Sequence, residues 1–156
     1  MVQYKAKYFK IRELVHPDLL KQLPESTLWL IFDERLLRGA DIIREIYGSC
    51  TINTSSLDSC GFVPFDSGRE AKFSPHKFGR GLDLHIVSIE KEAAKITDAV
   101  KRKKFKAQEY NKVRERLLLD QRITFLNFEY KSVSYPDGCT WLHIDTYNRP
   151  NRLFNA

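Results

Sequence analysis

The sequence lacks any long apolar run. No stretch of the 156 residues approaches the roughly 20 consecutive apolar residues that a membrane-spanning helix needs. The start, MVQYKAKYFKIRELV, alternates charged with aromatic side chains and has no continuous apolar segment of the signal-peptide type. We therefore expect no membrane span and synthesis in the cytoplasm, with release by lysis or incorporation into a phage virion as alternatives to retention there.

Cysteine is scarce, and repeats and low-complexity segments are missing. The three cysteines, Cys50, Cys60 and Cys139, are odd in number and widely spaced, without the Cys-x-x-Cys pairs of a structural zinc site. Buried reduced thiols are the expected state, and a Cys50–Cys60 bridge is the alternative.

The composition is that of an ordinary globular protein, with 42% apolar and 29% charged residues. At this length we expect one domain over residues 1–156. The net charge of +6 favours anionic partners such as bacterial envelope polymers. The basic run KRKKFK, residues 101–106, contains one aromatic residue and is expected to be a solvated linker, so nucleic acid is not the expected partner.

Hydrophobic periodicity predicts an α+β fold with N-terminal helices packed on a small, mostly antiparallel sheet. The clearest helix covers residues 33–48, where Asp33 can cap the start and Gly48 suits the end. The other expected helices cover residues 16–23, 90–102 and 108–119. The expected strands cover residues 50–55, 81–89, 123–130 and 140–147, with a long loop at 57–73 and an irregular tail from about residue 148.

Two histidines and an aspartate stand at positions where a metal could bind them together. Asp83 and His143 lie in separate predicted strands, and ligands on neighbouring strands can converge because alternate side chains share a face. His76 precedes Asp83 by seven residues, and Gly79 and Gly81 would let the backbone fold back tightly between them. A catalytic zinc takes three such protein ligands. The sequence therefore predicts a Zn²⁺ site.

The same residues form a pattern, Ser-x-His-x-x-Gly-x-x-x-Asp followed by Trp-Leu-His, that resembles a known family. It is similar to the zinc D-alanyl-D-alanine carboxypeptidases and related L-alanyl-D-glutamate endolysins, whose fold is shared with the Hedgehog signalling domain. The segments YFKIREL and IREIYGSCTINTS also look like those of phage-borne members. The matching positions are Ser74, His76, Gly79, Gly81, Asp83, Trp141, Leu142 and His143.

The resemblance implies a Hedgehog/DD-peptidase-like fold and a function. In that family the equivalents of His76, Asp83 and His143 bind zinc, and an arginine ahead of the first ligand holds substrate oxygens. The segment DSGRE offers Arg69 for this role, and a guanidinium fork suits a peptide carboxylate. Ser74 and Trp141 are the other residues expected beside the substrate, which would be a peptidoglycan peptide.

Thr140 departs from the family pattern. Active members carry Glu or Asp three residues before the last histidine, where the carboxylate takes a proton from water and passes it to the leaving amine. A threonine hydroxyl cannot do this near neutral pH. Strand alternation places His85 and Asp145 on the expected metal side, and Asp137 lies in the preceding turn, so these three are the candidate bases.

The sequence is therefore consistent with two functions. The first is a zinc peptidase that cuts an amide bond in bacterial peptidoglycan. The second is a virion, tail or wall-binding module that keeps the zinc and has lost hydrolysis, which Thr140 favours.

Overall fold

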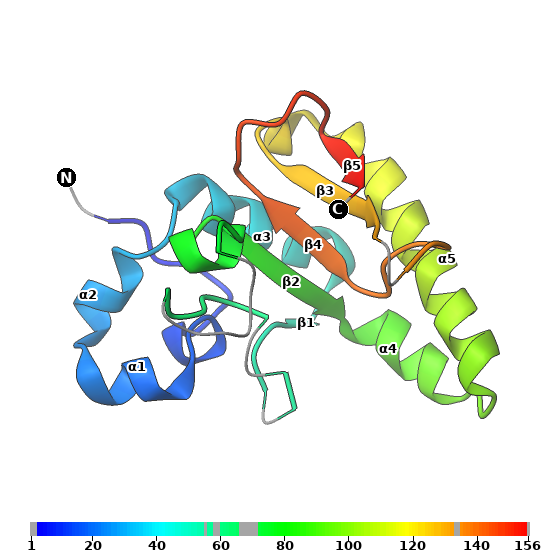
Figure 1. Cartoon of the computed structure of the whole chain (residues 1–156), viewed down its shortest axis with the longest axis horizontal. Helices are drawn as coiled ribbons and strands as arrows, with labels where there is room; N and C mark the ends of the chain where they lie inside the picture. Colours follow the sequence, from blue (N-terminus) through cyan, green and yellow to red (C-terminus); the bar gives the residue numbers. More distant parts are fainter. Residues whose placement is uncertain (1–2, 55, 58–59, 66–71, 133–134, 156) are drawn as a thin grey trace.

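The computed structural model describes residues 3–54, 56–57, 60–65, 72–132 and 135–155. Over these residues the centre is a five-stranded sheet with the strand order β1-β2-β4-β3-β5 (Figure 1). The β3–β5 pair is parallel and the other neighbouring pairs are antiparallel. The strands are Cys50–Thr51 (β1), Gly81–Ile86 (β2), Asn127–Lys131 (β3), Leu142–Asp145 (β4) and Leu153–Asn155 (β5).

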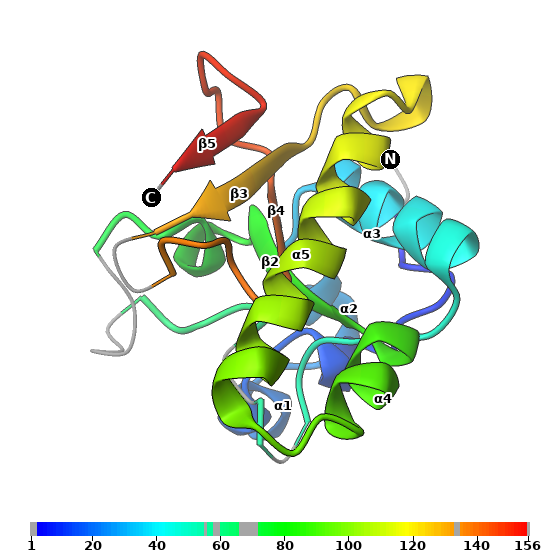
Figure 2. The same cartoon turned by 90° about the vertical axis from the view of Figure 1, so that its right-hand side faces the viewer.

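The helices lie at both ends of the sheet and against it. α1 and α2 lie at one end and α4 and α5 at the other (Figure 1), while Figure 2 shows α3 and α5 beside the strands. The helices are Pro17–Gln22 (α1), Glu25–Trp29 (α2), Glu34–Tyr47 (α3), Val87–Ala94 (α4) and Ala99–Leu118 (α5), with 3₁₀ turns Ile11–Glu13 (η1), Pro75–Phe78 (η2) and Gln121–Ile123 (η3). The α+β class is confirmed. No helix in the described part of the chain is long and apolar enough to cross a bilayer.

The two faces of the sheet differ in chemistry because successive side chains of a strand point to opposite sides. Leu82, Leu84 and Ile86 of β2 are fully buried in the apolar core. That core also contains Leu142 and Ile144 of β4 and buried side chains of α3 and α5. The alternate residues of the same strands, which include Asp83 and His143, therefore face the other side.

The predicted α3 forms as its sequence indicates. The Asp33 side chain accepts a hydrogen bond from the backbone N–H of Arg35 at the start. Gly48 ends the helix with a φ of +78°, a conformation that favours glycine. Leu36, Ala40 and Ile43 are fully buried, so the helix presents an apolar stripe to the core.

The expected boundaries between residues 87 and 118 are wrong. α4 begins at Val87, directly after β2, so the apolar residues 87–89 belong to a helix and not to the strand. The break between the helices falls before Ala99, where the Asp98 side chain accepts from the backbone N–H of Lys101. Residues 101–106 consequently lie within α5 and are not a linker.

The tail from residue 148 is also not wholly irregular. Leu153–Asn155 forms β5 and pairs in parallel with β3, with Leu153 opposite Phe128. The strand expected over residues 50–55 is limited to its first two residues. All three cysteines are free thiols, so the alternative of a Cys50–Cys60 bridge is not formed.

Candidate metal centre

Three side chains from distant parts of the chain meet on the face of the sheet opposite the core. Asp83 of β2 lies directly opposite His143 of β4 in the antiparallel ladder. His76 approaches from η2, and its ring lies 5.1 Å from the ring of His143, centroid to centroid. One potential ligand atom from each of the three residues lies within 4.8 Å of the other two. The structure thus brings together the set predicted from the sequence.

The turn after η2 places His76 over the sheet. Ser74 caps η2 by accepting a hydrogen bond from the backbone N–H of His76. Gly79 then adopts the left-handed conformation, with a φ of +63°. A Cβ on Gly79 would lie 2.0 Å from the carbonyl oxygen of Ile31, so no other residue fits there without movement of the backbone. This reversal leads the chain into β2, as expected from Gly79 and Gly81 in the sequence.

Backbone packing fixes the orientation of the His76 ring. Its Nδ1 lies 2.9 Å from the carbonyl oxygen of Gly61. Because a carbonyl can only accept, Nδ1 carries the proton, and Nε2 is left to bind a cation. Nε2 lies 3.6 Å from Oδ2 of Asp83. A metal-binding histidine commonly donates its second ring nitrogen to a carbonyl in this way.

His143 lies between two carboxylates. Its Nδ1 is 2.7 Å from Oδ1 of Asp83, and its Nε2 is 3.5 Å from Oδ2 of Asp145. Burial favours the neutral ring, but the hydrogen bonds and charges of Asp145 and Asp83 outweigh it and raise the pKa of His143 to about 10. Burial also acts against ionisation of Asp83, yet the neighbouring His76 and His143 lower the pKa of its carboxyl.

The donor set fits a divalent metal ion. Two imidazole nitrogens and one carboxylate oxygen are ligands of the kind that zinc and related ions bind at roughly 2.0–2.2 Å. Ligand atoms that share one such ion lie roughly 3.5 Å apart, and the potential ligand atoms of these three residues lie within 4.8 Å of one another, so shifts of about 1 Å would suit a shared ion. His76 and His143 are buried and Asp83 is partly exposed, which leaves one side of the group accessible.

Asp145, one of the candidate bases, is fully buried, and both of its carboxylate oxygens accept hydrogen bonds. It accepts hydrogen bonds from the Asn127 side chain, the backbone N–H of Tyr147 and the Arg149 guanidinium. Burial would raise its pKa, but the hydrogen bonds with His143, Arg149 and Asn127 lower it to about 2. Such a carboxylate orients His143 and is a poor proton acceptor.

The other two candidate bases point elsewhere. His85 lies on the same face as Asp83, but its Nδ1 is 3.4 Å from Oε1 of Glu90 and its Nε2 is 4.0 Å from Sγ of Cys60. Asp137 is exposed in the turn before β4, where it lines a hollow of about 480 Å³ against the first turns of α5.

The residues expected beside the substrate have mixed outcomes. Ser74 is buried and caps η2. Trp141 packs edge-on against Tyr135, and its indole N–H is buried without a hydrogen-bond partner among the described residues. Arg69 lies outside the described residues. Thr140, which stands where the resembling family carries its base, lines a hollow of about 230 Å³ together with Arg102 and Lys106.

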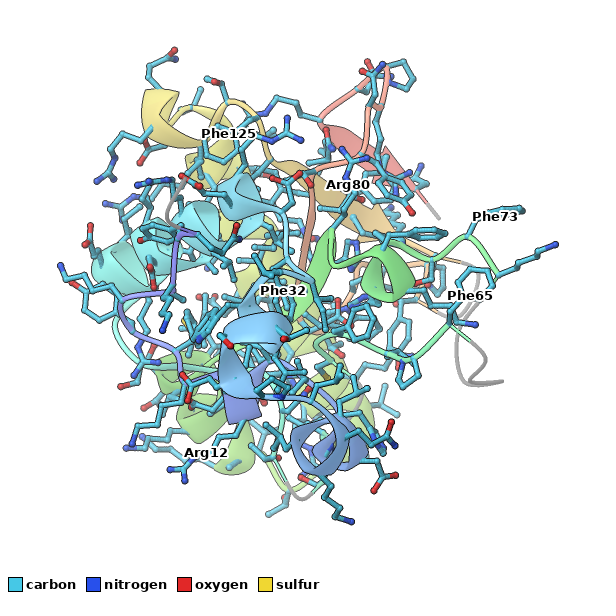
Figure 3. The ribbon with its side chains drawn as sticks, turned by 90° about the vertical axis from the view of Figure 1, so that its left-hand side faces the viewer. Arg12, Phe32, Phe65, Phe73, Arg80 and Phe125 are labelled. Atoms are coloured by element: carbon cyan, nitrogen blue, oxygen red, sulfur yellow. The ribbon has the colours of Figure 1, made fainter. Side chains whose placement is uncertain are left out.

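Exposed aromatic side chains lie around η2. Phe65, Phe73 and Phe78 are all more than two-fifths exposed, and the rings of Phe65 and Phe78 contact each other edge-on. Figure 3 shows Phe65 and Phe73 projecting outward from the same side of the molecule. Exposed aromatic groups of this kind are typical of binding surfaces.

Two supporting residues were missed from the sequence. Gly61 supplies a carbonyl oxygen to His76, and Asn127 supplies an amide N–H to Asp145. No sequence signal identifies a carbonyl in a long loop as a partner. Asn127 could have been noted, because it is a polar residue within a predicted apolar strand.

Comparison of the chain with known protein families, with curated proteins and with solved structures finds no match. The geometry of the site therefore carries the functional interpretation.

Proposed function

We propose that this chain is a zinc-dependent peptidase of the carboxypeptidase and endolysin type, with a Hedgehog/DD-peptidase-like fold, that hydrolyses amide bonds in peptidoglycan peptides. The observation that carries the proposal is the convergence of His76, Asp83 and His143 on one point. Their order and spacing are those of the family motif, and a motif gains weight when its residues meet in space.

The chain's own residues have defined roles in this proposal. His76, Asp83 and His143 hold the zinc, which supplies an acidified water and polarises the scissile carbonyl. Gly61 and Asp145 hold the two imidazoles in the binding orientation. The exposed Phe65 and Phe78 offer apolar surface for a peptide. The net charge of +6 favours an anionic substrate such as wall peptide.

Hydrolysis tests the proposal. Zinc-loaded protein is incubated with purified peptidoglycan and with peptides that end in D-Ala-D-Ala, and new amines and released D-alanine are measured. The expected result is turnover by the wild type and none by His76→Ala, which loses a ligand. If the wild type and His76→Ala release the same amounts, the peptidase proposal fails.

A second candidate function rests on Thr140. With no carboxylate at that position, the chain would be a zinc-stabilised binding module of a virion, a phage tail or the cell wall. This alternative predicts retained zinc, stability that falls with a chelator, and no hydrolysis at high protein concentration. Thr140→Glu separates the two: activity in this variant from an inactive parent would indicate a competent site that lacks only the base.

A further inference from the structure

A peptidase at this site needs a carboxylate that the family position does not provide. Position 140 is threonine, and Asp145 is fully buried and already bonded to three groups. Asp137 lies against α5. Glu90 forms an ion pair with Lys106 at 2.8 Å. A replacement therefore has to come from another element that reaches the metal-binding face.

Glu129 of β3 lies on the same face of the sheet as two of the proposed metal ligands, Asp83 and His143. Asn127 pairs with Asp145, and Phe128 pairs with Ile144, in the antiparallel β3–β4 ladder. Glu129 follows Phe128 and pairs with Phe154 of β5, whose ring lies 6.2 Å from the ring of His143, centroid to centroid. His143 itself lies opposite Asp83. Neighbouring strands lie about 4.8 Å apart. Glu129 is thus one strand from a ligand, on the same face, and is half-buried.

The Glu129 side chain contacts the residue next to the position of the missing base. Cys139, the residue before Thr140, donates its thiol hydrogen to Oε1 of Glu129 at an S–O distance of 3.2 Å. Burial raises the pKa of this thiol to about 12, and the negative charges of Glu129 and Asp83 add to the effect. The thiol therefore stays protonated and remains a hydrogen-bond donor to Glu129.

The Glu129 carboxylate can accept further hydrogen bonds besides the one from the Cys139 thiol. A carboxylate has about four lone-pair positions, and the Cys139 thiol, a weak donor, occupies one. Unlike Asp145, Glu129 is only partly buried, so water can reach it. These are the properties that a general base needs, together with a location next to the reacting atoms.

We propose that Glu129 is the general base and acid of this peptidase, in place of the residue lost at position 140. The inference rests on the proposed function. Glu129 takes one proton from the attacking water as its oxygen bonds to the amide carbon. It returns that proton to the amide nitrogen as the carbon–nitrogen bond breaks, so a carboxylic acid and an amine are released and the Glu129 carboxylate is restored.

Glu129→Gln is the main test, because glutamine keeps the size and can still accept from the Cys139 thiol. Turnover, zinc content and thermal unfolding are measured for this variant and for Glu115→Gln, an exposed position on α5. We expect kcat to fall by at least about 100-fold with one zinc per chain retained and KM within about threefold. Glu115→Gln should match the wild type in all three measurements.

Two further variants protect the test against a fold defect. Glu129→Asp keeps the charge and withdraws the carboxylate by one methylene, and should lower kcat by at least about tenfold. Glu129→Gln combined with Thr140→Glu should regain activity over Glu129→Gln alone. A wild type without turnover would refute the proposed function itself. Turnover in the wild type with Glu129→Gln within threefold of it, or a loss explained by lost zinc, would refute only the role of Glu129.

Discussion

Asp83, in β2, and Glu90, in the helix that follows β2, are two carboxylates with different surroundings. Asp83 faces the two imidazoles of His76 and His143. Glu90, at the start of α4, is bound by the ammonium group of Lys106 and by His85. Each group joins a carboxylate to histidine, but Glu90 is paired directly with a lysine, whereas the ion pairs of Asp83 among the described residues are with imidazoles. Lys106 already compensates the charge of Glu90, whereas the charge of Asp83 could be compensated by a bound cation.

The electrostatics of the two groups follow from this difference. Burial would raise the pKa of Glu90, but the hydrogen bond with His85 and the contact with Lys106 lower it to about 2. Tyr110 completes the group by donating to Glu90 at 2.9 Å. In the group of His76, Asp83 and His143 a proton on His143 supplies a positive charge, and a divalent ion could replace that proton.

The largest expected effect is on zinc affinity, which should differ between a substitution in the Asp83 group and one in the Glu90 group. Asp83→Ala removes a direct ligand and should weaken zinc binding by more than about 100-fold, beyond the 10–100-fold typical of supporting residues. His85→Ala, two residues along the same strand, should bind zinc within about threefold of the wild type. Competition with a fluorescent chelator measures both affinities. Equal losses in the two variants would show that the groups are not distinct.

The pH dependence of zinc affinity should also distinguish the His143 group from the Glu90 group. The pKa of His143 is raised from 6.5 to about 10, and the ring must lose its proton to bind a metal. Zinc affinity should therefore rise by about tenfold per pH unit between pH 6.5 and 9. Glu90→Gln, which changes the other group, should leave this slope unchanged. A flat profile would mean that His143 is not a ligand.

The same shift predicts how the metal-free protein responds to pH. A raised pKa in the folded state gives stability that is complete below 6.5 and is lost as the pH rises through about 10. Chelator-treated protein should therefore lose stability over this range, and His143→Ala should reduce the loss. Urea unfolding at pH 7 and at pH 10 measures the difference.

The smallest expected effect concerns the stability contribution of Glu90. Glu90→Gln should lower the free energy of unfolding at pH 7 by about 1–2 kcal/mol, because Lys106 loses its charged partner at a half-buried position. The lowered pKa of Glu90 gives stability that is present above 4.5 and is lost as the pH falls through about 2. The variant and the wild type should therefore converge near pH 2. A constant difference at every pH would contradict this assignment.

The parts of the fold that follow local rules could be predicted from the sequence. α3 has a capping aspartate, an apolar stripe and a terminal glycine, and these local signals were sufficient to predict the helix. The alternation of apolar and polar residues in β2 and β4 also predicted which side chains share the metal-binding face. Alternation accounts for the choice of Asp83 and His143. His76 was chosen because Gly79 and Gly81 allow a reversal between it and Asp83, and the family resemblance implied all three.

Other parts depend on tertiary contacts that local patterns do not encode. β5 has three residues and exists because β3 offers it a parallel edge. The break before α5 carried a readable signal in Asp98, but the β-branched residues 87 and 89 favoured a longer strand. The placement of Glu129 on the face that carries His143 requires the pairing of β3 with β4, whose register the sequence alone does not fix.

Anomalous diffraction from crystals grown with zinc tests the central claim most directly. One strong peak is expected between His76, Asp83 and His143, with ligand atoms at about 2.0–2.2 Å from the ion. A structure of zinc-treated protein with no peak at this position, or with zinc bound only at other residues, would contradict it.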